Sequence, residues 1–503
     1  MDQPTHEPPP PVSKKARILS FLFNNKNAKQ TIAKNTFWLS VSNFGGKAIR
    51  AVIIIYAARV LGAAEYGVFT YAITLAGFIS LVMDPGINFV FMRDAARASD
   101  EDQRSIFGTA FGIKLVLLAI GASIILFAGP LFSTLPGAKI LLPIAAIIAV
   151  FDTLRDFFLS LMRAREQMEW DAGITLVTNL AIVTVGFALL FLSPSAKSLI
   201  WGYALGSVIG TTIVMIALRS YIRTAFAKFR RRLAKPMVAA AWPFAITGAL
   251  GLLLTNADIL IISWFRSAEV VGIYAAGIRI IQALYLIPGI LQTSTLPLLA
   301  RLANSDNEKF RGTLERIVST LFLAAIPLAA GGIVVGTQLI GTIFGAAFIP
   351  GAPSFKILML TMMIDFPGSV IGTAVFAYGH QKSLIITSAT AGILNVALDL
   401  ALIPHFGMAG SALATLIAQG ASNAYLWVIM NRINPFSVAN RLRNVLIATA
   451  IMTVLAEALT LLHVEVFVTI ACCVAAYFAM LATFREPLLR EVTSRFQTRN
   501  PLS

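Results

Sequence analysis

The stretch DPGINFVFMRDAAR, residues 84–97, closes a long apolar segment and returns in reduced form as PGILQTSTLPLLAR, residues 288–301. In each copy an Ala-Glu pair stands 32 residues before an Ala-Arg pair, from 64 to 96 in the first and from 268 to 300 in the second. Self-similarity at a fixed offset is typical of a chain built from two copies of one unit. The sequence therefore predicts two related halves, each a bundle of the same kind.

The composition indicates what kind of bundle this is. The chain has 503 residues, of which 57% are hydrophobic and 13% charged, and its mean hydropathy is +0.79. A soluble domain carries about a quarter charged residues. Apolar stretches of roughly the 20 residues that a membrane-spanning helix needs recur along the whole chain. They are 36–58, 68–92, 106–129, 138–162, 171–193, 198–218, 237–264, 271–299, 317–344, 354–378, 382–404, 408–430, 443–462 and 464–484.

These stretches predict an all-α, polytopic membrane protein with about fourteen transmembrane helices. An even number of helices in each copy gives both copies the same orientation, so the two six-helix repeats are expected to be parallel. The expected parts are a basic tail 1–34, a first lobe 35–220, a basic linker 221–236, a second lobe 237–431, two extra helices in 443–484 and a tail 485–503.

The positive charges follow the predicted loops. With a cytoplasmic N-terminus, 30 of the 40 Lys and Arg residues fall in cytoplasmic segments and only five in outer loops. This bias is the positive-inside rule. The net charge of +16 therefore indicates topology and attraction to anionic membrane lipids rather than nucleic-acid binding. We expect a multi-pass protein of the cell membrane with both termini in the cytoplasm.

The first predicted helix carries a polar stripe. Thr36, Ser40, Asn43, Lys47 and Arg50 are spaced so that they share one helix face. A cation at the centre of a membrane helix costs roughly 2.5–3.5 kcal/mol, so such residues are expected to face a water-filled cavity or a partner. We predict that Asn43, Lys47 and Arg50 line a cavity.

Helices seven and eight offer further polar residues inside apolar runs. Arg279 and Gln282 are one turn apart on helix eight, and Asn256 and Asp258 lie near the outer end of helix seven. Asp258 has two interpretations: it pairs with Arg279 or a helix-one cation, or it carries a coupling proton or sodium ion. Asn256 is a candidate for the same coupling or gating role.

The remaining intramembrane charges are weaker candidates. Asp365 and Asp399 have no supporting stripe, and Lys114 is expected to extend its ammonium group toward the membrane surface. The histidines are scattered and Cys472 and Cys473 are adjacent in the last helix, so we expect no metal site, no structural disulfide and no cofactor.

Three segments together resemble a known family. They are NTFWLSVSNFGGKAIRAVIIIYAARVLGAAEYGVFTYA at 35–72, DPGINFVFMRDAAR at 84–97 and VVGIYAAGIRIIQALYLIPGILQTSTLPLLARL at 270–302. The chain resembles the polysaccharide-biosynthesis flippases of the multidrug/oligosaccharidyl-lipid/polysaccharide exporter superfamily, over about residues 30–430.

The resemblance implies a V-shaped pair of six-helix lobes that moves polyprenyl-pyrophosphate-linked oligosaccharide from the inner to the outer leaflet. It implies that cavity cations hold the pyrophosphate; Lys47, Arg50 and Arg279 can take that part, whereas helix two offers only Arg93 at its inner end. Expected partners are the lipid-linked glycan and membrane lipids, with a polysaccharide polymerase and chain-length proteins as further candidates.

Two other function classes stay open as alternatives. A drug or cation antiporter of the same superfamily would favour acidic residues in the first lobe, and helix one has none. A membrane glycosyltransferase or polymerase would need an acidic catalytic group and usually a sizeable outer loop, whereas the outer loops here span about ten residues or fewer. We therefore expect a transporter without catalytic residues rather than an enzyme.

The charge distribution makes a testable prediction about topology. Reporter fusions at Ser503 and within 228–235 should be active as cytosolic markers, because the basic segments are retained on the cytoplasmic side. A fusion beside Lys197, in a predicted outer loop, is the matched control and should report the opposite side. A signal from outside the cytoplasm at Ser503 or in 228–235 would contradict the fourteen-helix arrangement.

Overall fold

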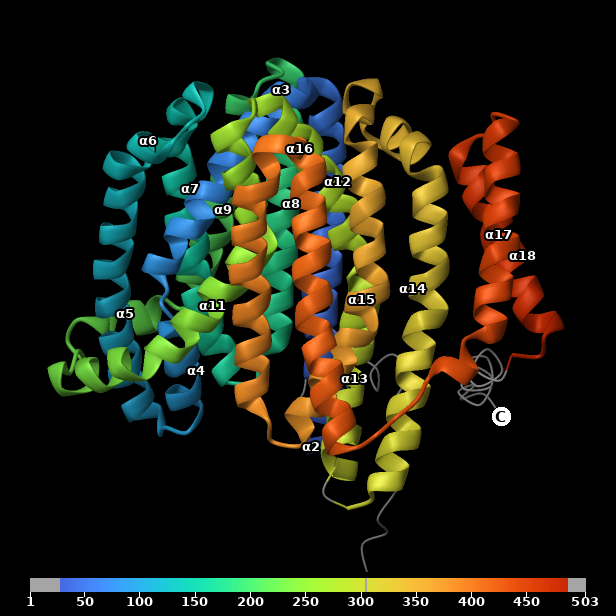
Figure 1. Ribbon diagram of the computed structural model, residues 1–503. Coiled ribbons are helices and arrows are strands. Elements are labelled where there is room, and N and C mark those ends of the chain that lie inside the picture. The colour runs from blue at the N-terminus through green and yellow to red at the C-terminus, as the bar shows by residue number, and fades with distance from the viewer. Residues whose placement is uncertain (1–27, 304, 487–503) are drawn as a thin grey trace, which may run out of the picture.

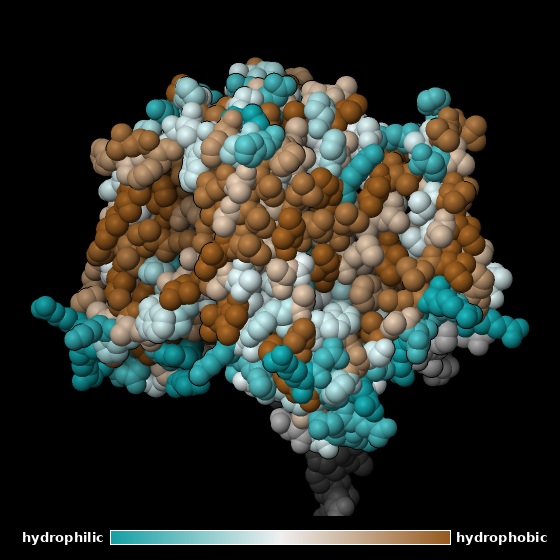
Figure 2. All heavy atoms as spheres, viewed as in Figure 1, coloured by the Kyte–Doolittle hydropathy of each residue, from teal (hydrophilic) through white to brown (hydrophobic). Residues whose placement is uncertain are grey.

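A computed structural model of the chain describes residues 28–303 and 305–486 (Figure 1). Within these two ranges the chain forms helices joined by short connections and contains no strand. The predicted all-α class is confirmed. Twelve of the helices are long and apolar enough to cross a membrane. Figure 2 shows their hydrophobic side chains gathered in a band between hydrophilic ends on the face in view.

Two of these twelve helices contain a glycine with non-helical backbone angles, Gly62 in α3 and Gly407 in α16. The 53 residues of α16 would extend about 80 Å if straight, against a hydrocarbon core of about 30 Å. Figure 1 shows that α16 instead folds back on itself. The predicted total of fourteen crossings and the parallel repeat stay predictions.

The first half of the chain runs from α2 to α10. Its helices are α2 (Ala28–Ser40), the π-helical η1 (Val41–Gly45), α3 (Gly46–Met83), α4 (Ile87–Ala96), α5 (Asp100–Ser123), η2 (Ile124–Ala128), α6 (Gly129–Phe132), α7 (Pro136–Ala164), α8 (Met168–Leu192), α9 (Ala196–Ala217) and α10 (Arg219–Ala225).

The second half begins with α11, whose first turns pack on the first half. The ring of Phe244 in α11 stacks on Phe89 of α4 with 5.2 Å between ring centres. The helices are α11 (Arg231–Phe265), α12 (Ala268–Leu284), α13 (Leu286–Ala303), α14 (Asn307–Phe344), η3 (Ala346–Gly351), α15 (Ala352–Ala377), α16 (Gln381–Ile433), η4 (Ala439–Arg441), α17 (Arg443–Leu461) and α18 (Val466–Thr483). The last two pack on α14, where the Tyr477 hydroxyl donates to the Leu323 carbonyl at 2.8 Å.

Two segments expected to be extramembrane tail or linker are partly helical. Helix α2 begins at Ala28, inside the predicted tail 1–34, and the linker 221–236 contains the end of α10 and the start of α11. Lys34 is only 1% exposed, and its buried charge is compensated by a Glu169 carboxylate oxygen of α8 that lies 2.9 Å from its ammonium group. The remainder of the first tail, and nearly all of 485–503, lie outside the described residues.

Lys114 does not extend to the membrane surface as predicted. Its ammonium group is fully buried and lies 3.2 Å from both the Asp84 carboxylate and the Met83 carbonyl. Those acceptors are exposed to it because Asp84, Pro85 and Gly86 interrupt the helix between α3 and α4. The quoted stretch DPGINFVFMRDAAR therefore begins with a helix break that a buried cation stabilises.

The two Ala-Glu copies contact each other where α3 crosses α12. A methyl group added at Gly67 would lie 1.8 Å from the Ala268 carbonyl oxygen, and one added at Gly272 would lie 1.9 Å from the Ala63 carbonyl oxygen. The contact is reciprocal: Gly67 packs on Ala268 of the second Ala-Glu pair, and Gly272 packs on Ala63, the residue before the first pair. Small residues four apart let membrane helices approach to backbone contact. We call this contact the glycine crossing.

A second contact links the two halves near the glycine crossing. The Arg59 Nε donates to the Ile343 carbonyl at 2.7 Å, and its guanidinium group also contacts the Thr342 carbonyl. Both carbonyls belong to the last turn of α14, where helix carbonyls have no partner within the helix. Cations are favoured at this end of a helix. We call this contact the Arg59 latch.

The glycine crossing predicts a selective loss of stability. Gly67→Leu should force the two backbones apart and lower the melting temperature of the purified protein by roughly 5 °C or more. Gly77→Leu on the same helix is the matched control, because an added Cβ there meets nothing within 4 Å. Equal melting temperatures for the two variants would show that the crossing is not a tight packing contact.

Candidate functional site

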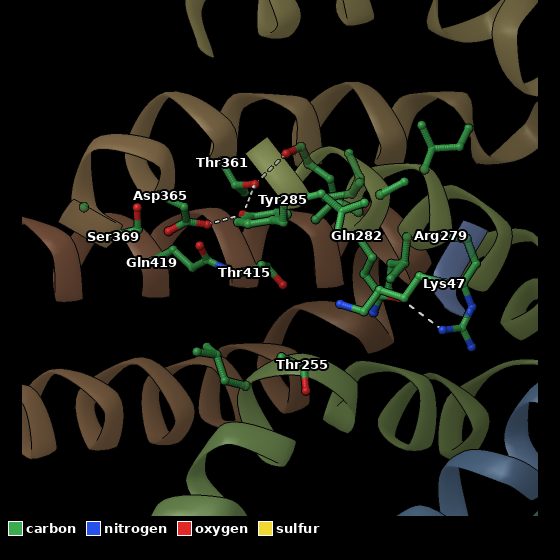
Figure 3. A pocket seen from close by; sticks show the side chains of 18 of the residues that line it. Lys47, Thr255, Arg279, Gln282, Tyr285, Thr361, Asp365, Ser369, Thr415 and Gln419 are labelled. Atoms are coloured by element: carbon green, nitrogen blue, oxygen red, sulfur yellow. Dashed lines mark hydrogen bonds between the residues drawn. The ribbon is translucent and has the colours of Figure 1, made fainter. Parts of the chain in front are cut away.

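A large cavity lies between α3 and the second half of the chain. Its volume is about 1490 Å³, and its walls come mainly from α3, α11, α12, α15 and α16. Figure 3 shows Lys47, Arg279 and Gln282 toward one end of the cavity and Asp365, Ser369 and Gln419 toward the other. The cavity is larger than the 300–1,000 Å³ of ordinary small-molecule sites, which leaves room for a sizeable ligand.

Arg50 is held in place by the first half of the chain. Its Nε donates to Asn179 Oδ1 of α8 at 2.9 Å, and its guanidinium carbon lies 5.5 Å from the centre of the Tyr203 ring of α9. Asn179 is itself fixed by donating to the Thr175 carbonyl at 2.8 Å. Sequence reasoning did not identify Asn179 and Tyr203 as supports for this arginine, because they lie on other helices.

Arg279 and Lys47 retain free hydrogen-bonding capacity. Arg279 Nη1 donates to Gln282 Oε1 at 3.0 Å, so the predicted one-turn pair forms. The buried Nε of Arg279 has no acceptor among the described residues. The Lys47 side chain is exposed in the cavity wall, and no described residue accepts a hydrogen bond from it or pairs with its charge.

We call Lys47, Arg50 and Arg279 the cation cluster. Within the described part of the chain, no carboxylate lies within 4.0 Å of any of the three. Four other cations of the first half lie beside carboxylates: Lys34 beside Glu169, Lys114 beside Asp84, Arg155 beside Asp152 and Asp156, and Arg163 beside Asp171. The cation cluster differs from these four cations because no described carboxylate neutralises its charge.

Two other predicted site residues are placed differently. Asn43 lies in η1, and its side chain is outside what the structure describes. Asn256 turns its amide to its neighbour and donates to Thr255 Oγ1 at 2.8 Å. Thr255 and Asp258 line the cavity, whereas Asn256 is not among its lining residues.

Asp258 does not form the predicted pair with a cation. Its Oδ2 accepts hydrogen bonds from the Tyr274 hydroxyl at 2.7 Å and from Thr415 Oγ1 at 3.3 Å. Two further residues extend this arrangement: Ser411 donates to the Tyr274 oxygen at 3.1 Å and Asn395 donates to Thr415 Oγ1 at 3.2 Å. Among the residues described, Arg279 and the helix-one cations lie beyond ion-pair distance of Asp258.

Asp399 completes this buried set. It is fully buried, and its charge is close enough to Asp258 for the two carboxylates to repel each other. Both Asp399 oxygens, Asp258 Oδ1 and Asn395 Oδ1 accept no hydrogen bond from the described residues. We call Asp258, Tyr274, Asn395, Asp399, Ser411 and Thr415 the carboxylate network. Asn395 and Asp399 are four residues apart on α16, as are Ser411 and Thr415, and this spacing is the sequence signal that was overlooked.

A comparison with protein families identifies the chain. Residues 32–303 match the family described as polysaccharide biosynthesis protein, which is more than half of the sequence. The chain belongs to this family. The matched region contains Lys47, Arg50, Asp258 and Arg279, and it ends before Asp365 and Asp399.

Two curated relatives of this family member come from the archaeon Haloferax volcanii. The probable low-salt glycan biosynthesis flippase Agl15 is 22% identical over 390 residues, which cover 77% of this chain and 81% of the relative. The probable flippase AglR is 22% identical over 380 residues, covering 74% and 77% of the two chains.

Solved structures share the fold. The lipid II flippase MurJ in an inward closed conformation aligns with a TM-score of 0.74 and 19% identity over 90% of this chain and 99% of that chain. An inward-facing multidrug resistance MATE family transporter of the MOP superfamily aligns with a TM-score of 0.59 and 13% identity over 78% and 94%. The chain therefore shares its fold with these two solved structures.

Proposed function

We propose that this protein moves a polyprenyl-pyrophosphate-linked oligosaccharide from the cytoplasmic to the outer leaflet of the cell membrane. The observation that carries the proposal is the cation cluster. Three cations from two halves of the chain line one cavity inside the membrane-spanning region and have no carboxylate partner in the described residues. In this proposal the protein acts as a transporter and not as an enzyme.

A pyrophosphate fits the chemistry of the cation cluster. Unpaired cations within a membrane protein are costly, and an anionic ligand offsets that cost when it is bound. Arginine forms bidentate hydrogen bonds with phosphate oxygens, while lysine contributes a compact positive charge. The unpartnered Nε of Arg279 and the free ammonium group of Lys47 are donors available to such a ligand.

The relatives support the same substrate class. Both Haloferax relatives are named as probable flippases, one of them for glycan biosynthesis, and the aligned MurJ structure is named a lipid II flippase. Membrane lipids are the second expected partner. A polysaccharide polymerase and chain-length proteins remain candidates that follow from the family assignment.

Transport by alternating access is consistent with the contacts between the halves. The cavity is lined by α3 on one side and by helices of the second half on the other, and the glycine crossing joins α3 to α12. We propose that this crossing and the Arg59 latch separate when the cavity changes the side of the membrane to which it opens. Both are local contacts that rocking of the two halves can break and remake.

The drug or cation antiporter alternative fits the cation cluster less well. A cationic drug would be repelled at the end of the cavity that holds the three cations, and the first-half wall of the cavity contributes Lys47 and Arg50 rather than an acid. Replacing the cation cluster therefore distinguishes the two functions, because it should impair export of an anionic lipid and not of a cationic drug.

The cation cluster predicts a graded loss of transport. Arg279→Ala removes a charge-assisted contact with the pyrophosphate and should lower the flipping rate by about tenfold or more. Arg279→Lys keeps the charge but loses the bidentate geometry, so its flipping rate should lie between those of the wild type and Arg279→Ala. The rate is measured in proteoliposomes with a fluorescent lipid-linked oligosaccharide, at equal protein content.

The matched control is Arg301→Ala, an exposed arginine in the last turn of α13, which should transport at the wild-type rate. At Arg50 we expect the same order of flipping rates among the wild type, the Lys variant and the Ala variant, with smaller differences, because Asn179 and Tyr203 also position that side chain. Wild-type rates for both Arg279→Ala and Lys47→Ala would rule out the cationic-cavity mechanism.

We further propose that the carboxylate network binds the coupling ion, a proton or a sodium ion. Two buried carboxylates with no cation beside them are costly while both are charged. Three of their oxygens and Asn395 Oδ1 accept no hydrogen bond from the described residues, and these four acceptors offer ligands for a proton or a hard cation. Because Asp258 also lines the cavity, ion binding at the network can be transmitted to the substrate site.

This proposal predicts that Asp258→Asn and Asp399→Asn uncouple transport from the gradient. Each variant should lower the rate of gradient-driven transport about tenfold, a change that corresponds to a typical coupling free energy between two sites. The abundance of each variant in the membrane should stay near that of the wild type. Asp100→Asn, at an exposed carboxylate, is the control. An equal fall in transport and abundance would indicate a folding role instead, and unchanged gradient dependence would remove the network from the mechanism.

A further inference from the structure

A third polar group lies in the cavity wall, away from the cation cluster. Asp365 of α15 faces Tyr285, which follows α12, and Gln419 and Asn423 of α16, which are one helical turn apart. We call these four residues the Asp365 cluster. Figure 3 shows Asp365 and Gln419 at the opposite end of the view from Lys47 and Arg279, with Tyr285 between them.

The cluster holds its carboxylate in a fixed orientation. The Tyr285 hydroxyl donates to Asp365 Oδ2, and Asn423 Nδ2 donates to Asp365 Oδ1 at 3.0 Å. Asn423 Nδ2 also donates to the Gln419 carbonyl at 2.9 Å. A methyl group at Gly368 would lie 1.7 Å from Asn423 Oδ1, so this asparagine reaches its position only because α15 has a glycine there.

The cluster still has acceptors to offer. A carboxylate oxygen can accept two hydrogen bonds, and each oxygen of Asp365 receives one from these neighbours. The buried Gln419 Oε1 accepts none from the described chain. No described lysine or arginine lies within 4.0 Å of Asp365. The cluster therefore presents negative charge and acceptor oxygens, and it selects a ligand that donates hydrogen bonds and carries no negative charge.

Hydroxyl groups of a sugar meet this requirement. Hydrogen bonds to an ionised carboxylate are about twice as strong as those between neutral groups, and neighbouring sugar hydroxyls can donate to the two oxygens together. A phosphate or a uronic acid would instead be repelled by Asp365. The two ends of the cavity thus favour opposite chemistries, an anion at the cation cluster and a neutral polyol at the Asp365 cluster.

We propose that the Asp365 cluster is the glycan subsite of the cavity and recognises an uncharged, hydroxyl-bearing sugar while the cation cluster holds the pyrophosphate. This inference rests on the proposed function and adds to it a substrate class, a lipid-linked glycan whose sugar at this subsite is neutral rather than acidic. Asp365, Gln419 and Asn423 are the residues that distinguish one glycan from another.

The test measures equilibrium binding of three probes to the purified full-length protein in lipid nanodiscs. The probes are polyprenyl pyrophosphate without a sugar, the same lipid carrying N-acetylglucosamine, and the same lipid carrying glucuronic acid. Asp365→Asn and Gln419→Leu should each weaken binding of the N-acetylglucosamine probe about tenfold and leave binding of the sugar-free lipid unchanged. Asp365→Asn should also bind the glucuronic acid probe more tightly than the wild type does.

Two controls separate this inference from the proposed function. Thr212→Val removes an exposed hydroxyl of α9 that donates within its own helix and does not line the cavity, and this variant should bind all three probes like the wild type. Arg279→Ala should weaken binding of all three probes, including the sugar-free lipid. Melting temperatures within a few degrees of the wild type establish that each variant is folded.

Several results would overturn the inference. In one, Asp365→Asn and Gln419→Leu weaken binding of the sugar-free probe as much as binding of the N-acetylglucosamine probe, and in another they leave binding of both unchanged. Either result would show that the cluster does not recognise the sugar. If Asp365→Asn binds every probe normally but no longer transports, the carboxylate serves the transport cycle instead. If the wild type binds none of the probes, the proposed function fails and the subsite with it.

Discussion

The backbone contact between Gly67 and Ala268, mirrored by Gly272 and Ala63, fixes how the two halves of this protein face each other. Lipid tails are as apolar as the helices they surround, so membrane helices gain little from hydrophobic burial and depend on close packing. Each helix of this crossing also carries cations of the cavity, Lys47 and Arg50 on α3 and Arg279 on α12. The same contact that joins the halves therefore brings positive charges from both of them to one cavity.

The handling of charge separates structural from functional residues. Lys34, Lys114 and Arg163 each have a carboxylate within 3.2 Å and are satisfied where they lie. The cations of the cavity have hydrogen-bonding neighbours such as Asn179 and Gln282 but no neutralising acid in the described chain. Neutral partners orient a cation without cancelling its charge, so the cavity keeps a positive potential for a ligand. The two acids of the cavity wall, Asp258 and Asp365, show the converse arrangement, with hydroxyl and amide partners and no cation within ion-pair distance in the described chain.

Features that depend on one helix could be predicted from the sequence, and features that depend on contacts between distant helices could not. The polar stripe placed Lys47 and Arg50 at a cavity because helical spacing determines which residues share a face. The pairing of Arg279 with Gln282 followed from the same rule. The prediction that Lys114 extends to the membrane surface was wrong, because its partner Asp84 becomes available only where the helix breaks after Met83. Asp399 was undervalued because Asp258, which lies 141 positions earlier, meets it only in the folded bundle.

The two sides of the Arg59 latch differ in their sensitivity to natural sequence variation. One side of it is a side chain, and the other consists of main-chain carbonyls at positions 342 and 343. Nearly any residue can occupy those two positions and still present the same oxygen atoms, so α14 can diverge there without loss of the contact. Position 59 has no such freedom, because only a long side chain with several donors reaches both carbonyls. Among homologues, compensating changes across this contact should therefore be rare, and its loss should follow from substitutions on one side alone.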